Sequence, residues 1–191
     1  NQVIAFLYLA LQMGNVPPTS LAKLPDLMEQ TIEKVEAQIS VLEQTMAGAS
    51  DMYCLGYGST YPIALEGALK LKEVTYIHSE GMLSTEFKHG PLSAVHDDYP
   101  IIFVAGPEDI PLIVSGINEV TCRGARAVVI GEEDSRLRAN ATNMIVVPTS
   151  GPLFLPITST LPLQLLSYRI SVARGFDPDF PRNLSKTLTV D

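Results

Sequence analysis

Short, uninterrupted apolar runs separated by helix-like segments are the feature that most constrains this 191-residue chain. Four such runs lie at residues 52–55, 101–105, 127–130 and 144–147, and a further short strand is expected at 77–80. Strands that are apolar at every position are buried on both faces, as in parallel sheets with helices on each side. The pattern therefore predicts an α/β fold, a doubly wound (Rossmann-like) sheet of five parallel strands flanked by helices.

The segments around these runs carry the helical pattern. Within the alternating region, helices are expected at residues 61–75, 110–123 and 153–174. The last of these contains Pro156 and Pro162, two points at which a helix can be interrupted because proline lacks the backbone N–H.

Two further helices are expected before the alternating region. Residues 1–13 are apolar but too few to span a bilayer, and a segment with two prolines follows them. Residues 20–47 repeat apolar side chains at helical spacing, which predicts a long connecting helix packed on a neighbour. A helix that starts at the first residue without a cap suggests that the chain is a piece of a longer one.

Charge and cysteine content exclude several classes of function. The net charge of −8 argues against nucleic acid or an anionic membrane as the main partner. The two cysteines, Cys54 and Cys122, suit a reducing, cytoplasmic environment, and Cys54 lies in an apolar run where a buried thiol is expected. The three histidines lie in different segments without ligand spacing, so no metal site is expected.

A glycine-containing turn follows the first apolar run. Gly56, Gly58 and Ser59 lie where a parallel strand meets a helix, and ligands bind at such carboxyl ends. Backbone N–H groups in this turn could hold an anion. The turn lacks the third glycine of the dinucleotide fingerprint and the lysine of the phosphate loop. Two interpretations stay open: a working anion site, or a remnant of one.

Three charged residues share one face of the helix expected at 61–75. Glu66, Lys70 and Glu73 follow a spacing of four and then three residues, which places them in one stripe. One interpretation is a solvated face with ion pairs. The other follows from the small and apolar character of the remaining residues, which predicts a mostly buried helix on which a carboxylate and a lysine need partners or a chemical role.

His89 and the last sixteen residues carry the other candidate groups. Gly90 and Pro91 place His89 on a turn, where an imidazole can exchange protons near neutral pH; a plain surface histidine is the alternative. Residues 176–191 either fray or fold back over a site. The amine of Lys186 can condense with a ketone to form an imine, unless it is only a solvated lysine. Three residues offer apolar anchors for docking: Leu184, Leu188 and Val190.

Three stretches, LEGALKLKE at 65–73, KHGPL at 88–92 and PRNLSKTLTV at 181–190, resemble one known family. It is that of the glutamine–fructose-6-phosphate aminotransferases, or glucosamine-6-phosphate synthases, whose isomerase region contains two sugar-isomerase (SIS) domains. The resemblance covers residues 50–191, is weak across 105–150, and points to the second of these domains. It implies an SIS fold with an N-terminal helical connector and an extended C-terminal tail.

The resemblance also implies domain boundaries and residue roles. Glu73 matches the isomerising base, His89 the ring-opening residue that serves the neighbouring subunit, and Lys186 the imine-forming lysine. Substrate contacts are implied for Lys70, Ser185 and Glu66. The implied divisions are 1–15 as the last helix of a preceding and mostly absent SIS domain, 16–50 as the connector, 51–175 as the SIS domain and 176–191 as the active-site tail.

The reaction implied is the conversion of fructose 6-phosphate and glutamine-derived ammonia to glucosamine 6-phosphate, without cofactor or metal. The implied partners are a glutaminase domain, a first SIS domain and a second copy of the chain in a homodimer. The chain alone is expected to be inactive or weakly active. Two alternatives remain: another SIS enzyme, such as a sugar-phosphate isomerase or a glucosamine-6-phosphate deaminase, and a non-catalytic domain that senses sugar phosphates.

Overall fold

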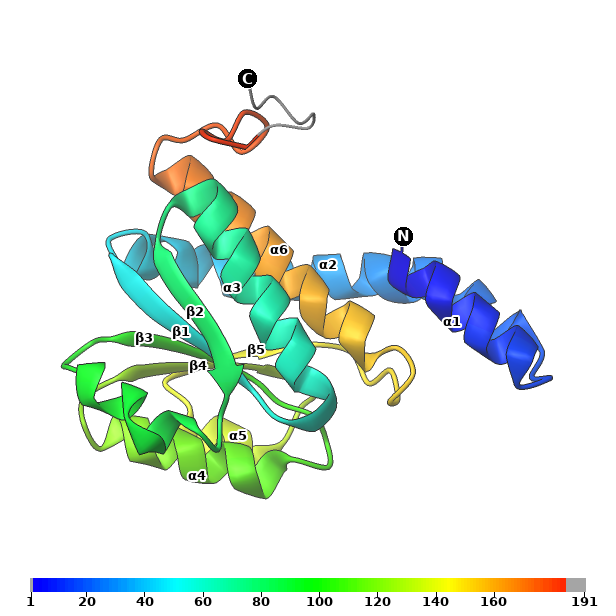
Figure 1. The fold of residues 1–191 in the computed structure, drawn as a ribbon, viewed down its shortest axis with the longest axis horizontal. Coiled ribbons are helices and arrows are strands. Elements are labelled where there is room, and N and C mark those ends of the chain that lie inside the picture. Colours follow the sequence, from blue (N-terminus) through cyan, green and yellow to red (C-terminus); the bar gives the residue numbers. More distant parts are fainter. Residues whose placement is uncertain (1, 185–191) are drawn as a thin grey trace.

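A five-stranded parallel sheet forms the centre of the structure, a computed structural model that describes residues 2–184 (Figure 1). The strand order is β2-β1-β3-β4-β5, and every neighbouring pair is parallel. This confirms the predicted doubly wound sheet. The strands are β1 Asp51–Gly56, β2 His78–Leu83, β3 Pro100–Val104, β4 Arg126–Gly131 and β5 Asn143–Val146.

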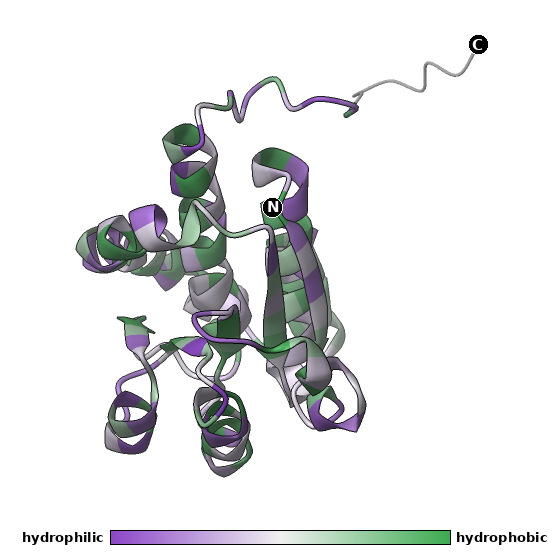
Figure 2. Cartoon of the chain, turned by 90° about the vertical axis from the view of Figure 1, so that its left-hand side faces the viewer, coloured by the Kyte–Doolittle hydropathy of each residue, from purple (hydrophilic) through white to green (hydrophobic). Residues whose placement is uncertain are grey.

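Helices cover both faces of the sheet. The long helices α2, α3 and α6 lie on one face, and α4 and α5 lie on the other (Figure 1). Figure 2 shows that these helices carry both hydrophobic and hydrophilic residues. The helices are α1 Gln2–Met13, α2 Leu24–Met46, α3 Tyr61–Thr75, α4 Ile110–Thr121, α5 Ser135–Asn140 and α6 Leu155–Ala173; the 3-10 turns are η1 Pro18–Lys23, η2 Gly58–Thr60, η3 Phe87–His89 and η4 Pro91–Ala94.

The close packing of α3 against α6 depends on one glycine. A Cβ atom on Gly67 would lie 2.8 Å from both methyl carbons of Leu163, which is fully buried. Such a distance is far inside van der Waals contact, so any larger residue would force the helices apart. The missing side chain therefore sets how near α3 lies to α6 over the sheet.

Two local predictions need correction. The helix at 153–174 is α6, and it runs through Pro162 without a break. Pro156 lies in its first turn, where the absent N–H has no helical partner to lose, and Pro162 is buried inside the helix, where core packing offsets the lost hydrogen bond.

The short helix α5 was not expected. Asp134 starts it by accepting hydrogen bonds from the backbone N–H groups of Arg136 and Leu137.

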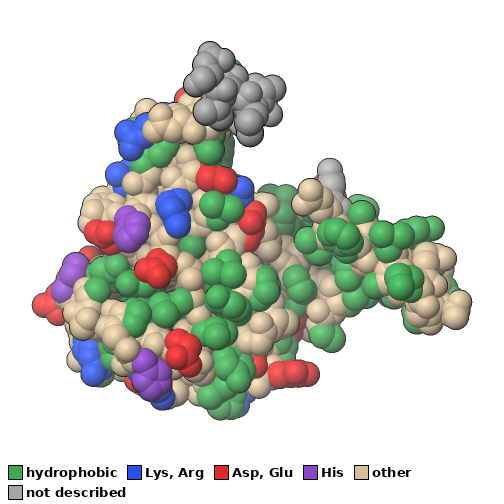
Figure 3. Space-filling view, in the orientation of Figure 1, with side chains coloured by type: hydrophobic (Ala, Val, Ile, Leu, Met, Phe, Trp, Pro, Cys, Tyr) green, Lys and Arg blue, Asp and Glu red, His purple; other side chains and the backbone are tan. Residues whose placement is uncertain are grey.

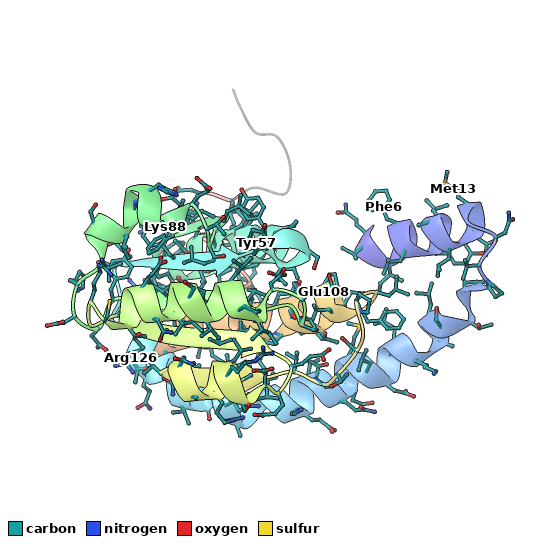
Figure 4. All side chains as sticks on the ribbon, turned by 90° about the horizontal axis from the view of Figure 1, so that it is seen from below. Phe6, Met13, Tyr57, Lys88, Glu108 and Arg126 are labelled. Atoms are coloured by element: carbon teal, nitrogen blue, oxygen red, sulfur yellow. The ribbon has the colours of Figure 1, made fainter. Side chains whose placement is uncertain are left out.

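The first helix extends away from the sheet (Figure 1). α1 contacts the rest of the chain through Ile4 and Leu7, which pack on a small cluster with Leu24 and Phe154. Five other large apolar side chains of α1 are exposed, and Figure 4 labels Phe6 and Met13 among them; the five are Val3, Phe6, Tyr8, Leu9 and Met13. Among residues 2–184, no helix is both long and apolar enough to cross a membrane.

Candidate active site

The turn between β1 and α3 is built around Thr60. Its hydroxyl accepts a hydrogen bond from the backbone N–H of Tyr57 at 3.0 Å and lies 2.8 Å from the carbonyl oxygen of Val104, at the end of β3. Gly56 is required here because a Cβ atom would lie 2.5 Å from the Thr60 carbonyl oxygen. These contacts fix where α3 starts relative to the carboxyl ends of β1 and β3.

The same turn is poorly suited to bind an anion. Gly58 adopts φ 53°, and a Cβ atom there would lie 3.5 Å from a carboxylate oxygen of Asp109. Burial and the nearby Glu108 raise the pKa of Asp109 above its usual value, and its carboxyl group, when ionised, would repel an anion bound at this turn. Of the two open interpretations of Gly56, Gly58 and Ser59, the geometry favours the remnant.

Lys70 lies between the two carboxylates of the α3 stripe. Its Nζ atom is 2.6 Å from Oε2 of Glu73 and 3.8 Å from Oε1 of Glu66. The hydrogen bond to Glu73 raises the pKa of Lys70 above its usual 10.5, since the carboxylate favours the ammonium form. The three side chains therefore form the stripe that their spacing predicted, with Glu73 as the closer partner.

The expectation that α3 is mostly buried was wrong. Leu65 and Leu69 are 41% and 44% exposed and lie on the outer side of the helix. Figure 3 shows the face that α3 presents to solvent, where charged side chains lie among hydrophobic ones. A composition of small and apolar residues did not mean burial, because α6 and the sheet cover only the side of α3 that bears Ile63, Ala64, Gly67, Ala68, Leu71 and Thr75.

Glu73 and Glu66 face different grooves. Glu66 lines an open groove of about 620 Å³ beside α1 and the start of α6. Glu73 lines another of about 500 Å³ at the end of α3. The second groove is bordered by Leu69, Lys72, Tyr76, Ile77 and His78 on one side and by Arg182, Asn183 and Leu184 of the tail on the other.

The described part of the tail folds back over the end of α3 (Figure 1). Arg182 contacts Tyr76 through both its backbone and its guanidinium group. Leu184, expected as an apolar anchor, borders the groove but stays 52% exposed. Ser185, Lys186, Leu188 and Val190 lie outside the described residues.

His89 lies away from the Glu73 groove. It ends η3, is exposed, and donates its backbone N–H to the carbonyl of Glu86 at 3.0 Å. Its position on a turn matches the expectation from Gly90 and Pro91. Within residues 2–184, no hydrogen bond or ion pair joins the His89 side chain to α3, so its implied role stays a prediction.

Two further sequence-based expectations concern histidine, cysteine and carboxylate side chains. In the described part of the chain, no cluster of three histidine, cysteine, aspartate or glutamate side chains could hold a metal ion. Cys54 is fully buried as expected, and burial raises the pKa of its thiol to about 12.

Two aromatic residues beside the groove were missed by the sequence reasoning. Tyr76 follows α3 directly, Phe176 follows α6 after Gly175, and their rings meet edge to face at 4.7 Å. The available signal was weak: each is an aromatic residue just past a predicted helix end.

Comparison with known proteins identifies the kind of domain to which this geometry belongs. The family model described as "SIS domain" matches residues 45–174. Glutamine–fructose-6-phosphate aminotransferase (isomerizing) of Methanothermobacter thermautotrophicus is 42% identical over 174 residues, covering 90% of this chain and 29% of the relative. The protein of that name from Legionella pneumophila strain Paris is 39% identical over 197 residues, covering 100% of this chain and 32% of the relative. The chain thus spans about 30% of the length of these relatives.

Solved structures agree with the family match. The C-terminal domain of glucosamine-fructose-6-phosphate aminotransferase from Francisella tularensis has a TM-score of 0.74 at 31% identity, over 82% of this chain and 44% of that one. Glucosamine-6-phosphate deaminase from Thermotoga maritima has a TM-score of 0.70 at 22% identity, over 94% of this chain and 52% of that one. The second likeness shows the fold alone.

Proposed function

Because the chain belongs to the SIS domain family, we propose that it is the C-terminal SIS domain of a glutamine–fructose-6-phosphate aminotransferase. The identity of about 40% to proteins of that name extends along nearly all of the chain. The deaminase is only 22% identical and supports no function beyond the fold. In this proposal residues 51–175 form the domain, 16–50 the connector, 1–15 the last helix of a preceding SIS domain and 176–191 the active-site tail.

The single observation that carries the proposal is the position of Glu73. Its carboxylate is held by Lys70 and lines the groove that the tail closes on one side. Moving a proton between neighbouring carbons of an open-chain sugar requires such a base in a site that the enzyme can cover. Lys186, the lysine proposed to form the imine, follows Leu184 by two residues in the sequence.

In the proposed reaction, three side chains each catalyse a different step. His89 of the neighbouring subunit opens the ring of fructose 6-phosphate by proton exchange. The Lys186 amine attacks the C2 ketone and water leaves, which gives an imine; ammonia then displaces the lysine. Glu73 takes a proton from C1 and returns it to C2. The C1 hydroxyl loses its proton and the C2 nitrogen gains one, so that C1 becomes the aldehyde and C2 carries the amine of glucosamine 6-phosphate.

The remaining parts of the proposal concern contacts and partners. Lys70 and Ser185 are proposed to contact substrate, and Lys70 also orients Glu73. The substrate contact implied for Glu66 stays a prediction, because Glu66 lines the other groove. The relatives are more than three times as long as this chain, which leaves room for the proposed glutaminase domain and first SIS domain. We infer a homodimer because His89 does not line the groove of its own Glu73.

A borohydride trap on the full-length protein tests the proposal. Fructose 6-phosphate is added, the imine is reduced, and the adduct is mapped by mass spectrometry. An adduct on Lys186, together with glutamine-dependent formation of glucosamine 6-phosphate, is the expected result. Product formed from ammonia alone with no response to glutamine would favour a deaminase running in reverse, and sugar-phosphate binding without an adduct or product would favour a sensing domain.

A further inference from the structure

The carboxyl ends of α3 and α6 lie next to each other and are linked by a hydrogen bond. The hydroxyl of Ser171 in α6 donates a hydrogen bond to the carbonyl of Val74 in α3 at 2.8 Å, which satisfies a carbonyl that the helix end leaves without a partner. Gly175, just past the end of α6, has φ 75°, and Tyr76, just past the end of α3, has φ 60°. Each helix is therefore followed by a residue in the left-handed conformation.

The end of α6 directs the chain toward Tyr76. The N–H of Phe176 bonds to the carbonyl of Ser171 and that of Gly175 to the carbonyl of Val172, a Schellman motif. The turn brings the Phe176 ring to 4.7 Å from the Tyr76 ring at an interplanar angle of 64°. An edge-to-face contact of this kind has a preferred geometry, so it fixes direction as well as distance.

A second contact brings the tail back to the same tyrosine. The backbone N–H of Arg182 donates to the Tyr76 hydroxyl at 2.8 Å, and its guanidinium carbon lies 4.0 Å from the centre of the Tyr76 ring. Within the loop between Phe176 and Arg182, the Asp177 side chain accepts the N–H of Asp179 at 2.9 Å and forms a local turn. Tyr76 is thus contacted at both ends of the loop.

From these contacts we infer that Tyr76 is a positioning residue that holds residues 176–184 along the Glu73 groove, and that the imine chemistry proposed for Lys186 depends on this hold. The inference rests on the proposed function. Tyr76 directly follows the last residue of α3 and lies three positions after Glu73, so the proposed base and the residue that holds the tail are close together in the chain. Arg182, Asn183 and Leu184 border the groove directly after the held point, and Lys186 follows them in the sequence.

Two substitutions distinguish the contribution of the Tyr76 ring from that of its hydroxyl. Tyr76→Asn removes both, and asparagine tolerates the left-handed backbone at φ 60°. Tyr76→Phe removes only the hydroxyl that accepts the Arg182 N–H and keeps the ring. Phe180→Ala is the matched control, because Phe180 lies in the same loop with 83% of its surface exposed.

Two measurements on the full-length protein test the inference. Amide hydrogen exchange of residues 177–184 needs no substrate, and in Tyr76→Asn it is expected to be about tenfold faster. The rate of borohydride trapping at Lys186 is expected to fall about tenfold in the same variant, with kcat falling and glutaminase activity unchanged. Tyr76→Phe is expected to restore trapping to within about threefold of the natural protein while leaving the Arg182 amide exposed, and Phe180→Ala to match the natural protein in both measurements.

The outcomes distinguish this inference from the proposed function. Unchanged exchange in Tyr76→Asn overturns the holding role, and faster exchange with normal trapping overturns the link to Lys186. Absence of an adduct in the natural protein overturns the proposed function instead, while exchange still reports on the held tail. If Tyr76→Asn does not fold, Arg182→Ala removes only the guanidinium contact and is expected to slow trapping about threefold; a normal rate in that variant overturns the inference.

Discussion

Lys70 and Glu73 form an ion pair on one face of α3, with Nζ 2.6 Å from Oε2. The second carboxylate within reach of Lys70, that of Glu66, lies 3.8 Å away and faces another groove. Of the two carboxylates on the stripe, only Glu73 lines the groove that the tail borders. The lysine therefore orients the carboxylate that shares a groove with Arg182, Asn183 and Leu184 of the tail.

Replacing Glu73 by glutamine is expected to stop isomerisation. Glu73→Gln keeps the size of the side chain but removes the base, so kcat for glucosamine 6-phosphate formation should fall by at least about 100-fold. Glutaminase activity should remain, because the change lies in the sugar site. Glu80→Gln, an exposed position on β2, is the control. Normal turnover in Glu73→Gln would remove this carboxylate from the mechanism.

Mixing two inactive variants tests whether His89 serves the partner's site. His89→Ala and Glu73→Gln are each expected to be inactive, but a mixed dimer has one site with an intact Glu73 and an intact His89 from the other subunit. Statistical mixing should restore about one quarter of the natural activity. The activity is measured after denaturing and refolding the two variants together. No recovery, with mixed dimers verified by tagged subunits, would place His89 outside the partner's site.

The raised pKa of Lys70 predicts a stability difference that depends on pH. Because the folded pKa exceeds the usual 10.5, the pair stabilises the fold fully below that pH and loses its effect as pH rises through the folded value. Lys70→Met should therefore lower the free energy of unfolding by about 0.3–1 kcal/mol at pH 8. Denaturant unfolding of both proteins at pH 8 and above pH 11 measures the difference, and an equal difference at both pH values would contradict the ion pair as its source.

The close approach of α3 and α6 predicts the sign of one glycine substitution. Gly67→Ala improves helix propensity by about 1 kcal/mol, but the new methyl group would meet buried Leu163 at 2.8 Å. Overpacking costs about 1–3 kcal/mol, so a net loss near 1 kcal/mol is expected. Gly48→Ala, where the methyl group meets nothing within 4 Å, should be neutral or stabilising. Calorimetric melting temperatures of both variants, compared with that of the natural protein, test these signs. A higher melting temperature for Gly67→Ala would show that Leu163 can move aside.

The two cysteines should differ sharply in reactivity. Cys54 is fully buried with a thiol pKa of about 12, so it carries almost no thiolate near neutral pH. Cys122 is exposed and should react first. Mass mapping after iodoacetamide treatment at pH 8 should find label on Cys122 alone in the folded protein, and on both after denaturation. Rapid labelling of folded Cys54 would mean that β1 opens readily.

The local character of each segment could be predicted from the sequence. Apolar runs indicated the strands at 52–55, 101–105, 127–130 and 144–147, and these correspond to β1, β3, β4 and β5. The spacing of the stripe on α3 was predicted for the same reason, since it depends only on the 3.6-residue helical turn. α5 was missed because six residues are too few to show a helical period.

What the sequence determined by itself was a set of local properties: which segments are strands or helices, and which charged side chains share a helix face. These follow from the backbone geometry of neighbouring residues. The tertiary structure alone decided that Leu65 and Leu69 stay exposed and that a carboxylate of Asp109 lies against Gly58. It also brought Tyr76 into contact with Arg182, 106 positions away in the chain. Burial and long-range contact depend on which elements pack together, and that packing is settled by the whole core rather than by any one segment.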